Sequence, residues 1–164
     1  MGEKGWAWRP MALGDLRAVL AIAAAVHPDY PESEAVFAER LALFPAGCLM
    51  LESGGAAAGY AMAHPWYRRH PPALDVLLGA LPPVPEVFYL HDLALLPAAR
   101  GAGAGRVAIQ RLAALAGGLP MALVAIAGTE EFWRAQGFAA TSDPALDAIL
   151  RRYDDAARYM ERSP

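Results

Sequence analysis

The sequence lacks the features that mark exported or membrane-embedded proteins. Cys48 is its only cysteine, so no disulfide can form within the chain, and a reducing cytoplasm is the expected location. The opening MGEKGWAWRPMALGDL does not have the basic-then-apolar order of a signal peptide. No uncharged apolar run reaches the ~18 residues that a membrane-spanning helix requires. We therefore expect a cytoplasmic protein that has no membrane partner.

An excess of positive charge is also absent. The chain has 14 Lys and Arg residues against 17 Asp and Glu residues, a net charge of −3, so it has no basic field to attract phosphate backbones. We expect no nucleic-acid partner. What the sequence does contain is 56% hydrophobic and 19% charged residues over 164 positions. That balance is typical of a single soluble domain, here spanning residues 1–164.

Two helices and a hairpin are predicted in the first part of the chain. Apolar residues recur at three- and four-residue spacing over 15–26, and a second helix is expected to begin after the N-cap Ser33. Strands over 48–52 and 56–64 are joined by a Ser-Gly-Gly turn that is typical of a tight hairpin. The proline-rich stretch 65–85 then predicts a long loop, because proline disrupts both helix interiors and strand ladders.

The second part of the chain predicts a strand–loop–helix–strand unit. Residues 86–96 are aromatic and aliphatic between two prolines, and we expect them to form a central strand. The glycine-rich stretch 100–106, a helix and a strand over 121–126 follow, an order that gives a parallel pair with a right-handed crossover. A short helix over 130–136 and a last strand over 157–162 complete a mixed α+β fold.

Glycine occupies alternate positions of Arg-Gly-Ala-Gly-Ala-Gly, residues 100–105, where the strand gives way to the helix. Main-chain N–H groups of such a loop can surround a pyrophosphate, which the positive end of the helix dipole also favours. Taken alone, the glycines favour the simpler interpretation of a tight strand-to-helix turn. A P-loop is excluded because no Lys-Ser or Lys-Thr follows. A Rossmann pattern through Gly103, Gly105 and Ala108 lacks the acidic residue expected about 20 positions later.

Three segments in order resemble one enzyme family. YLHDLALLPAARGAGAG, 89–105, resembles the acetyl-CoA-binding motif of the Gcn5-related N-acetyltransferases (GNAT), with the motif core beginning at Arg100. AGTEEFWRAQGF, 127–138, is similar to the helix that follows in the family, and WRPMALGDL, 8–16, is similar to its common opening. The resemblance implies the GNAT fold, a mixed central β-sheet flanked by helices.

The resemblance also implies where the coenzyme lies. Main-chain groups of 93–95 pair with the pantetheine arm, residues 101–106 cradle the pyrophosphate, and the N–H of Leu95 polarises the thioester carbonyl. The cofactor-binding residues implied in this way are Leu93, Ala94, Leu95, Arg100, Gly101, Ala102, Gly103, Ala104, Gly105, Arg106 and Trp133. Acetyl-CoA is the implied co-substrate. No metal is expected, because His64 and His70 have no cysteine or carboxylate at ligand spacing.

A protonated amine cannot attack a thioester, so a base is required. His91 is the first candidate, because it lies in the coenzyme strand and an imidazole titrates near neutral pH. Tyr89 shares the same face of a regular strand and is expected to position water. Asp92, the reserve candidate, lies on the opposite face unless a bulge re-aims it. Each of the three is equally a residue type that serves as a hydrogen-bonded structural group in a strand.

Trp133 stands where many family members have a tyrosine that protonates the departing thiolate. An indole has no proton for that task, so we expect Trp133 to pack beside the pantetheine. We interpret the cluster over 64–70 as mostly solvated surface, and Cys48 as a core residue rather than a nucleophile.

The sequence therefore predicts acetyl transfer from acetyl-CoA to an amine by direct attack. A non-catalytic acyl-CoA-binding or sensor module with the same fold is the alternative, and a dinucleotide-binding oxidoreductase is a third interpretation. The fold does not name the acceptor, so a small-molecule amine and a protein amine both stay open. A homodimer formed through exposed sheet edges or helices is a further expectation.

Overall fold

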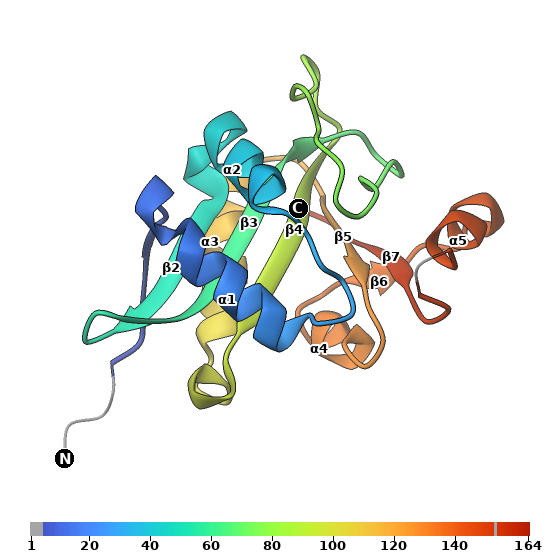
Figure 1. Ribbon diagram of the computed structural model, residues 1–164. Coiled ribbons are helices and arrows are strands. Elements are labelled where there is room, and N and C mark those ends of the chain that lie inside the picture. Colours follow the sequence, from blue (N-terminus) through green and yellow to red (C-terminus); the bar gives the residue numbers. More distant parts are fainter. Residues whose placement is uncertain (1–4, 153) are drawn as a thin grey trace.

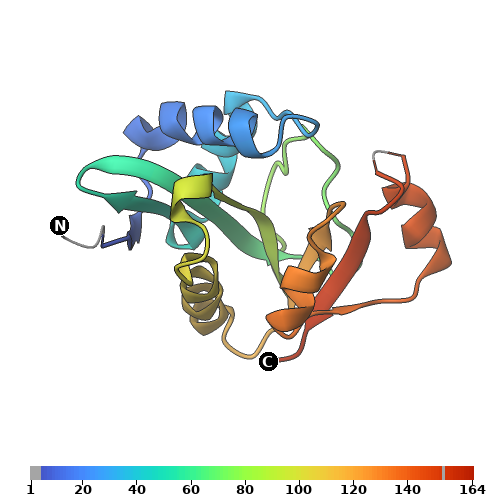
Figure 2. The ribbon, with the colours of Figure 1, turned by 90° about the horizontal axis from the view of Figure 1, so that it is seen from below.

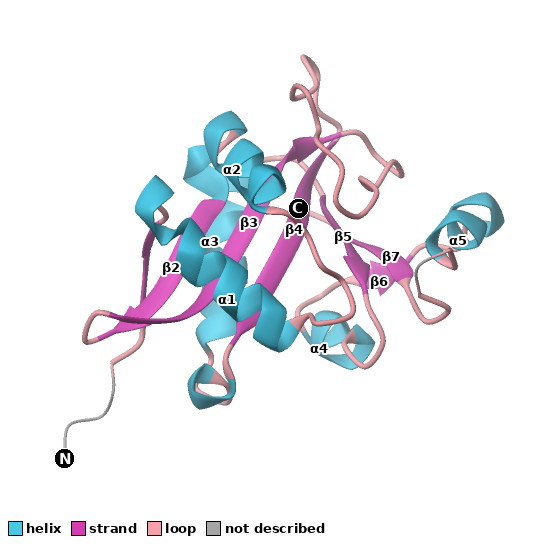
Figure 3. Cartoon of the chain, in the orientation of Figure 1, coloured by secondary structure: helices cyan, strands magenta, loops and turns pink. Residues whose placement is uncertain are grey.

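A mixed β-sheet organises the protein (Figures 1 and 3). The structure is a computed structural model that describes residues 5–152 and 154–164. Within those residues the sheet has seven strands in the order β1-β2-β3-β4-β5-β7-β6. The strands are β1 (Ala7–Pro10), β2 (Cys48–Ser53), β3 (Ala56–Trp66), β4 (Val87–Leu95), β5 (Met121–Ala125), β6 (Ala139–Ala140) and β7 (Arg158–Arg162). The fold is α+β, and β4 is the central strand that its aromatic and aliphatic sequence predicted.

Helices cover both faces of the sheet (Figure 2). They are α1 (Leu16–Val26), α2 (Glu34–Leu43), α3 (Ala104–Ala116), α4 (Glu130–Ala135) and α5 (Pro144–Leu150). On one face, Val19 of α1 and Phe37 of α2 belong to the same buried cluster as Met62 of β3. On the other face, Leu112 of α3 packs in a second cluster with Phe88 of β4. Both faces of β3 and β4 are therefore buried, which explains their nearly continuous apolar sequence.

Three short elements were not predicted from the sequence: β1, β6 and α5. β1 is an edge strand ending at Pro10, a place where proline costs little because one side of the strand needs no ladder partner. β6 has two residues, too few for a periodic signal. α5 did have a signal, since the carboxylate of Asp143 caps it by accepting a hydrogen bond from the N–H of Leu146 at 3.2 Å, and Pro144 follows the cap.

β4 and β5 pair at two positions and then separate. Their parallel register joins Phe88 to Met121 and Tyr89 to Ala122. β4 continues to Leu95, paired on its other side with β3 as far as Gly59. Beyond Tyr89, the β5 side of the central strand is therefore open. This opening, rather than any loop alone, positions the candidate site.

Candidate active site

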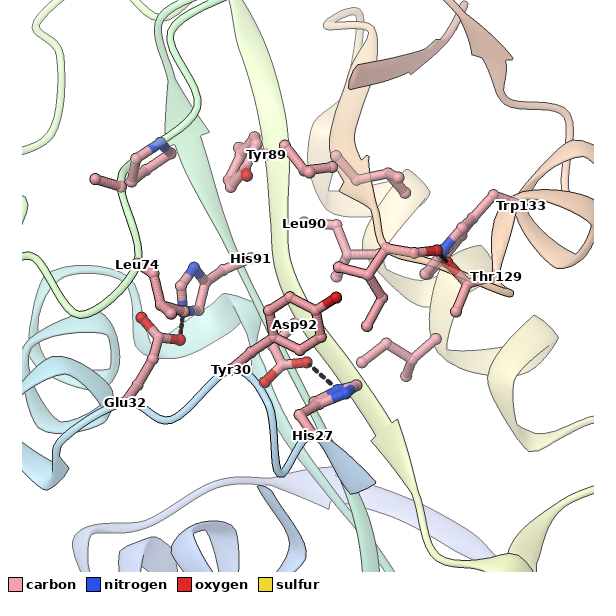
Figure 4. A pocket seen from close by; sticks show the side chains of 16 residues that line it. His27, Tyr30, Glu32, Leu74, Tyr89, Leu90, His91, Asp92, Thr129 and Trp133 are labelled. Carbon is pink, nitrogen blue, oxygen red and sulfur yellow. Dashed lines mark hydrogen bonds and ion pairs between the residues drawn. The ribbon is translucent and has the colours of Figure 1, made fainter. Parts of the chain in front are cut away.

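A pocket of about 140 Å³ lies where β4 and β5 separate (Figure 4). Residues 89–93 of β4 form one wall and the end of β5 with the start of α4 forms another. The segment between α1 and α2 contributes His27, Tyr30 and Glu32, and the loop between β3 and β4 contributes residues 72–74. The pocket is thus built from segments far apart in sequence that meet at the central strand.

A β-bulge in β4 shapes this pocket. Met62 of β3 lies opposite Asp92, whereas the next residue, Ala63, lies opposite Leu90, so His91 is the extra residue on β4. A bulge bends the strand and changes the direction of the side chains next to it. His91 and Asp92 both line the pocket. The strand is therefore not regular at this point, and the alternative in which a bulge re-aims Asp92 is the one observed.

Two histidine–carboxylate pairs connect β4 to the segment between α1 and α2 (Figure 4). The Nε2 atom of His91 lies 2.8 Å from Oε1 of Glu32, and Nε2 of His27 lies 2.9 Å from Oδ1 of Asp92. Each pair thus takes one residue from β4 and one from the segment after α1. Sequence reasoning named His91 and Asp92 but missed His27 and Glu32, because no local spacing links residues that the fold brings together across dozens of positions.

The His27–Asp92 pair favours its charged form. Burial by itself raises the pKa of Asp92, but the hydrogen bond and positive charge of His27 outweigh it, so the pKa of this carboxyl is lowered. Burial likewise opposes a charge on His27, yet Asp92 raises the pKa of the imidazole above its usual value. The hydroxyl of Tyr60 also donates a hydrogen bond to Asp92. An imidazolium beside a carboxylate is the state that these contacts stabilise.

The loop between β3 and β4 is held over the pocket by carboxylates. Glu39 of α2 accepts hydrogen bonds from the N–H groups of Leu78 at 2.6 Å and Gly79 at 3.0 Å. Glu32 accepts one from the N–H of Asp75 at 3.1 Å. The long loop that the prolines predicted over 65–85 is confirmed over 67–86, because β3 continues through Pro65 to Trp66. Glu32 links this loop to the imidazole of His91 at the bulge.

His64 departs from the sequence interpretation. It was grouped with the solvated cluster over 64–70, but it lies in β3 with 1% of its surface exposed. Its ring centroid is 5.7 Å from that of Tyr89 and 6.5 Å from that of His91. Tyr89 lines the same pocket as His91. Burial lowers the pKa of His64 to about 3, so the imidazole is neutral at physiological pH and supports the wall of the pocket.

The burial of His64 should make the stability of the protein depend on pH. Unfolded His64 binds a proton below its ordinary pKa of about 6.5, whereas the folded residue does not until about pH 3, so acidification favours the unfolded state. Between pH 6.5 and pH 3, His64 should lower the free energy of unfolding by about 1.4 kcal/mol for each unit by which the pH falls. Chemical denaturation at a series of pH values should show this slope in the parent protein and its loss in His64→Gln. Replacing the exposed His70 with glutamine should leave the slope unchanged, and equal slopes in all three proteins would contradict the assignment.

The glycine-rich loop between β4 and α3 has the backbone conformation that its glycines predict. Gly101 and Gly103 have φ angles of 83° and 78°, in the left-handed region that other residues rarely adopt. Gly103 is the N-cap of α3, a helix of 13 residues, whose first N–H groups have no partner within the helix. A Cβ atom on Gly105 would lie 3.3 Å from Cζ of Phe132. The loop thus combines an exposed turn with close packing of α3 against α4.

The two arginines of this stretch have different surroundings. Arg100 donates a hydrogen bond from Nε to the carbonyl oxygen of Leu95 at 3.0 Å, which fixes the end of β4 relative to the loop. Arg106 extends back toward the turn, because one of its terminal nitrogens lies 3.7 Å from the position of a Cβ on Gly103. A cationic side chain next to the N-terminus of α3 adds to the positive potential there.

Trp133 is buried and lines the pocket from the α4 side. Its ring packs edge to face against Phe132 at 4.9 Å and Phe138 at 5.7 Å between centroids.

Cys48 is buried as predicted, and burial raises the pKa of its thiol to about 12, so it is no nucleophile. Among the described residues, no group of three His, Cys, Asp or Glu residues has an arrangement that would hold a metal. No helix in the same part of the chain is long and apolar enough to cross a membrane.

Known proteins resemble this chain in sequence and in fold. The sequence model of the acetyltransferase (GNAT) family matches residues 15–139. Ard1 from Thermoplasma volcanium superposes with a TM-score of 0.73 at 16% identity, over 96% of this chain and 97% of that one. Naa20 from Chaetomium thermophilum, solved with a bisubstrate analogue, gives a TM-score of 0.70 at 18% identity over 96% and 86% of the two chains.

A third similar structure is the GphF GNAT-like decarboxylase in complex with isobutyryl-CoA, with a TM-score of 0.71 at 22% identity over 96% of this chain and 98% of that one. At these identities the structural likeness shows the fold alone. No curated protein matches the sequence.

Proposed function

Because the chain belongs to the acetyltransferase (GNAT) family, we propose that it is an N-acetyltransferase that moves the acetyl group of acetyl-CoA directly to an amine. One observation carries the proposal. The glycine-rich turn at the start of α3 and the open side of β4 are continuous in the chain, and β4 runs from that turn to the pocket that contains His91 and Glu32.

The turn and the open strand fit the two ends of a coenzyme A molecule. The N–H groups after Gly103, together with Arg106, suit the pyrophosphate, because an anion is favoured at a helix N-terminus that no side chain blocks. Leu93, Ala94 and Leu95 present a strand edge to which the pantetheine amides can bind. The N–H of Leu95 is our candidate for stabilising the oxyanion that forms during attack. Acetyl-CoA supplies the activated acyl group as co-substrate.

His91 is the proposed base. When its Nε2–H group donates to Glu32, the Nδ1 atom carries the lone pair that can accept a proton from the acceptor amine. The carboxylate of Glu32 holds the ring in place and stabilises the imidazolium that forms, as the carboxylate does in other His–carboxylate pairs. Tyr89, on the same wall, is proposed to position water for this proton transfer. The amine then attacks the thioester without a covalent enzyme intermediate.

The acceptor is proposed to be a compact amine or the amine of a protein segment. Ard1 and Naa20 share the fold. In the loop over 67–86, Leu74 lines the pocket, and Val76 and Leu77 of the same loop are exposed apolar side chains. Such a rim suits an acceptor with an apolar body. These features favour an amine with apolar surroundings over a highly charged acceptor.

Thiol release from acetyl-CoA, measured against a panel of small amines and short peptides, tests the proposal. We expect release above the hydrolytic background with at least one class of amine, and mass spectrometry should find the acetyl group on that amine. Measurable binding of acetyl-CoA with no acetylation across the panel would instead support the alternative, an acyl-CoA-binding module without catalysis. Absence of acetyl-CoA binding would remove both interpretations.

A further inference from the structure

His27 lines the pocket but has no role in the proposed mechanism. It is the C-terminal cap of α1, and its ring lies against β4 at two consecutive residues. Its Nε2 atom pairs with Asp92 at 2.9 Å, and a hydrogen bond with the main chain of Leu93 further favours the protonated ring. The side chain is 17% exposed and lines the pocket. His27 is thus a partly accessible imidazole at the point where the open side of β4 enters the pocket.

This position matters because of the leaving group. If the pantetheine arm follows residues 93–95 of β4, as the proposed function requires, its sulfur lies at the pocket end of that path, close to the residues that His27 contacts. Breaking the thioester leaves a thiolate, which needs a proton or a positive charge. Trp133, on the opposite wall, has only an indole N–H and cannot provide that proton.

The charges around His27 keep a proton on its ring. Asp92 faces it from β4, and Glu32 adds a second negative charge from the segment after α1. His91 is the other imidazole nearby and interacts with Asp92. Tyr60, from β3, donates to the far oxygen of Asp92 and so leaves Oδ1 to His27. The C-terminal end of α1, where the helix dipole is negative, also favours a cation at this position.

We propose that His27 is the proton donor to the departing coenzyme A thiolate and that Asp92 is the residue that positions it. The acceptor ammonium first loses one proton to His91 and, through it, to water. The neutral amine nitrogen then forms a bond to the acetyl carbon and passes its second proton to His91. The C–S bond then breaks and its electron pair goes to sulfur. The imidazolium of His27 transfers its proton to that sulfur, which yields the free thiol and a neutral His27. Exchange with water afterwards takes the proton from His91 and returns one to His27, so no proton is gained or lost by the enzyme.

The bound thiol of coenzyme A gives a direct test that needs no acceptor. An imidazolium next to a thiol stabilises the thiolate and lowers the pKa of the thiol. In the complex of the parent protein with coenzyme A, the ultraviolet absorbance of the thiolate should appear at a pH about one unit or more below that of free coenzyme A. His27→Gln, which keeps a donor for Asp92 but has no transferable proton, should return the titration to that of the free thiol. Asp92→Asn should also move the titration of the bound thiol toward that of the free thiol.

The control variants are matched to this change. His70→Gln makes the same substitution at an exposed histidine outside the pocket and should leave the titration unchanged. His91→Gln removes the other imidazole. A parent complex that titrates like free coenzyme A overturns the proposal without any variant, and so does a shift abolished by His91→Gln but retained in His27→Gln.

Turnover gives a second readout once an acceptor is known. The rate of the parent enzyme should fall at alkaline pH as His27 loses its proton. His27→Gln should lose this alkaline limb and turn over about a hundredfold more slowly, the lower end of the range for general acid catalysis, while its affinity for coenzyme A stays within a few-fold. An alkaline limb that persists in the variant contradicts the assignment. Failure to acetylate any amine would count against the proposed function alone, since the thiol titration still decides the role of His27.

Discussion

Replacing Gly103 with glutamate is expected to abolish acetyl-CoA binding while the protein stays folded. Gly103 is the N-cap of α3 and has a φ angle of 78°, so a side chain there adds about 1–2 kcal/mol of backbone strain. The larger effect is local. A carboxylate at this turn repels a pyrophosphate and competes for the same N–H groups, and each charge-assisted hydrogen bond that is lost removes about 1.5–3 kcal/mol. Loss of two such bonds raises the dissociation constant at least about a hundredfold.

A matched variant separates binding from strain. Gly54, in the turn between β2 and β3, also has a positive φ angle, and a Cβ there would meet no atom within 4 Å. Gly54→Glu therefore introduces the same charge and the same kind of strain away from α3, and it should bind acetyl-CoA like the parent. Calorimetry measures binding in each protein and thermal unfolding checks the fold. If Gly103→Glu also bound acetyl-CoA like the parent, the pyrophosphate assignment would fail.

Replacing His91 with alanine is expected to reduce turnover about a hundredfold or more, in the range of general base catalysis, with little change in acetyl-CoA affinity. The reason for this separation is the position of His91. Its ring interacts with Glu32 at the bulge, whereas the glycine-rich turn proposed to hold the pyrophosphate lies past the far end of β4. Rates measured from acidic to alkaline pH, with the acceptor saturating, should stay below those of the parent throughout.

The partner of His91 sharpens this experiment. Glu32→Gln keeps the shape of the side chain and an oxygen acceptor but removes the negative charge, so it should slow turnover less than His91→Ala. His70→Ala, a change at an exposed histidine outside the pocket, should have no effect. Unchanged turnover in His91→Ala at every pH would exclude His91 as the base and leave water, ordered near Tyr89, as the remaining route for the proton.

Much of the secondary structure could be predicted because the sequence patterns that specify it are local. The helix after Ser33 is observed as Glu34–Leu43, and the strand expected over 86–96 is observed as Val87–Leu95. Apolar spacing, proline boundaries and caps act within a few residues, so a single sequence reveals them. The elements that were missed had little signal of this kind, apart from the Asp143-Pro144 cap of α5.

The sequence predicted only part of the pocket, because the contacts that form it are not local. His91 and Asp92 were chosen because they lie in the coenzyme strand, but their relation to each other depends on the register of β3 against β4. A shift of one residue in that register reverses which side chains share a face. His64 was also misjudged: it ends the strand predicted over 56–64 but was grouped with a solvated cluster, whereas β3 continues to Trp66 and buries it.

The sequence by itself determined that a glycine turn follows a central strand and begins a helix, because turn and cap chemistry depends on neighbouring residues. It also determined the family, through motifs in the correct order. Only the tertiary structure decided which acid–base groups meet. The bulge at His91 directs two adjacent residues into one pocket, and packing of α1 and α2 against the sheet brings His27 and Glu32 to face them. Contacts between distant segments depend on packing and register, which no local pattern specifies.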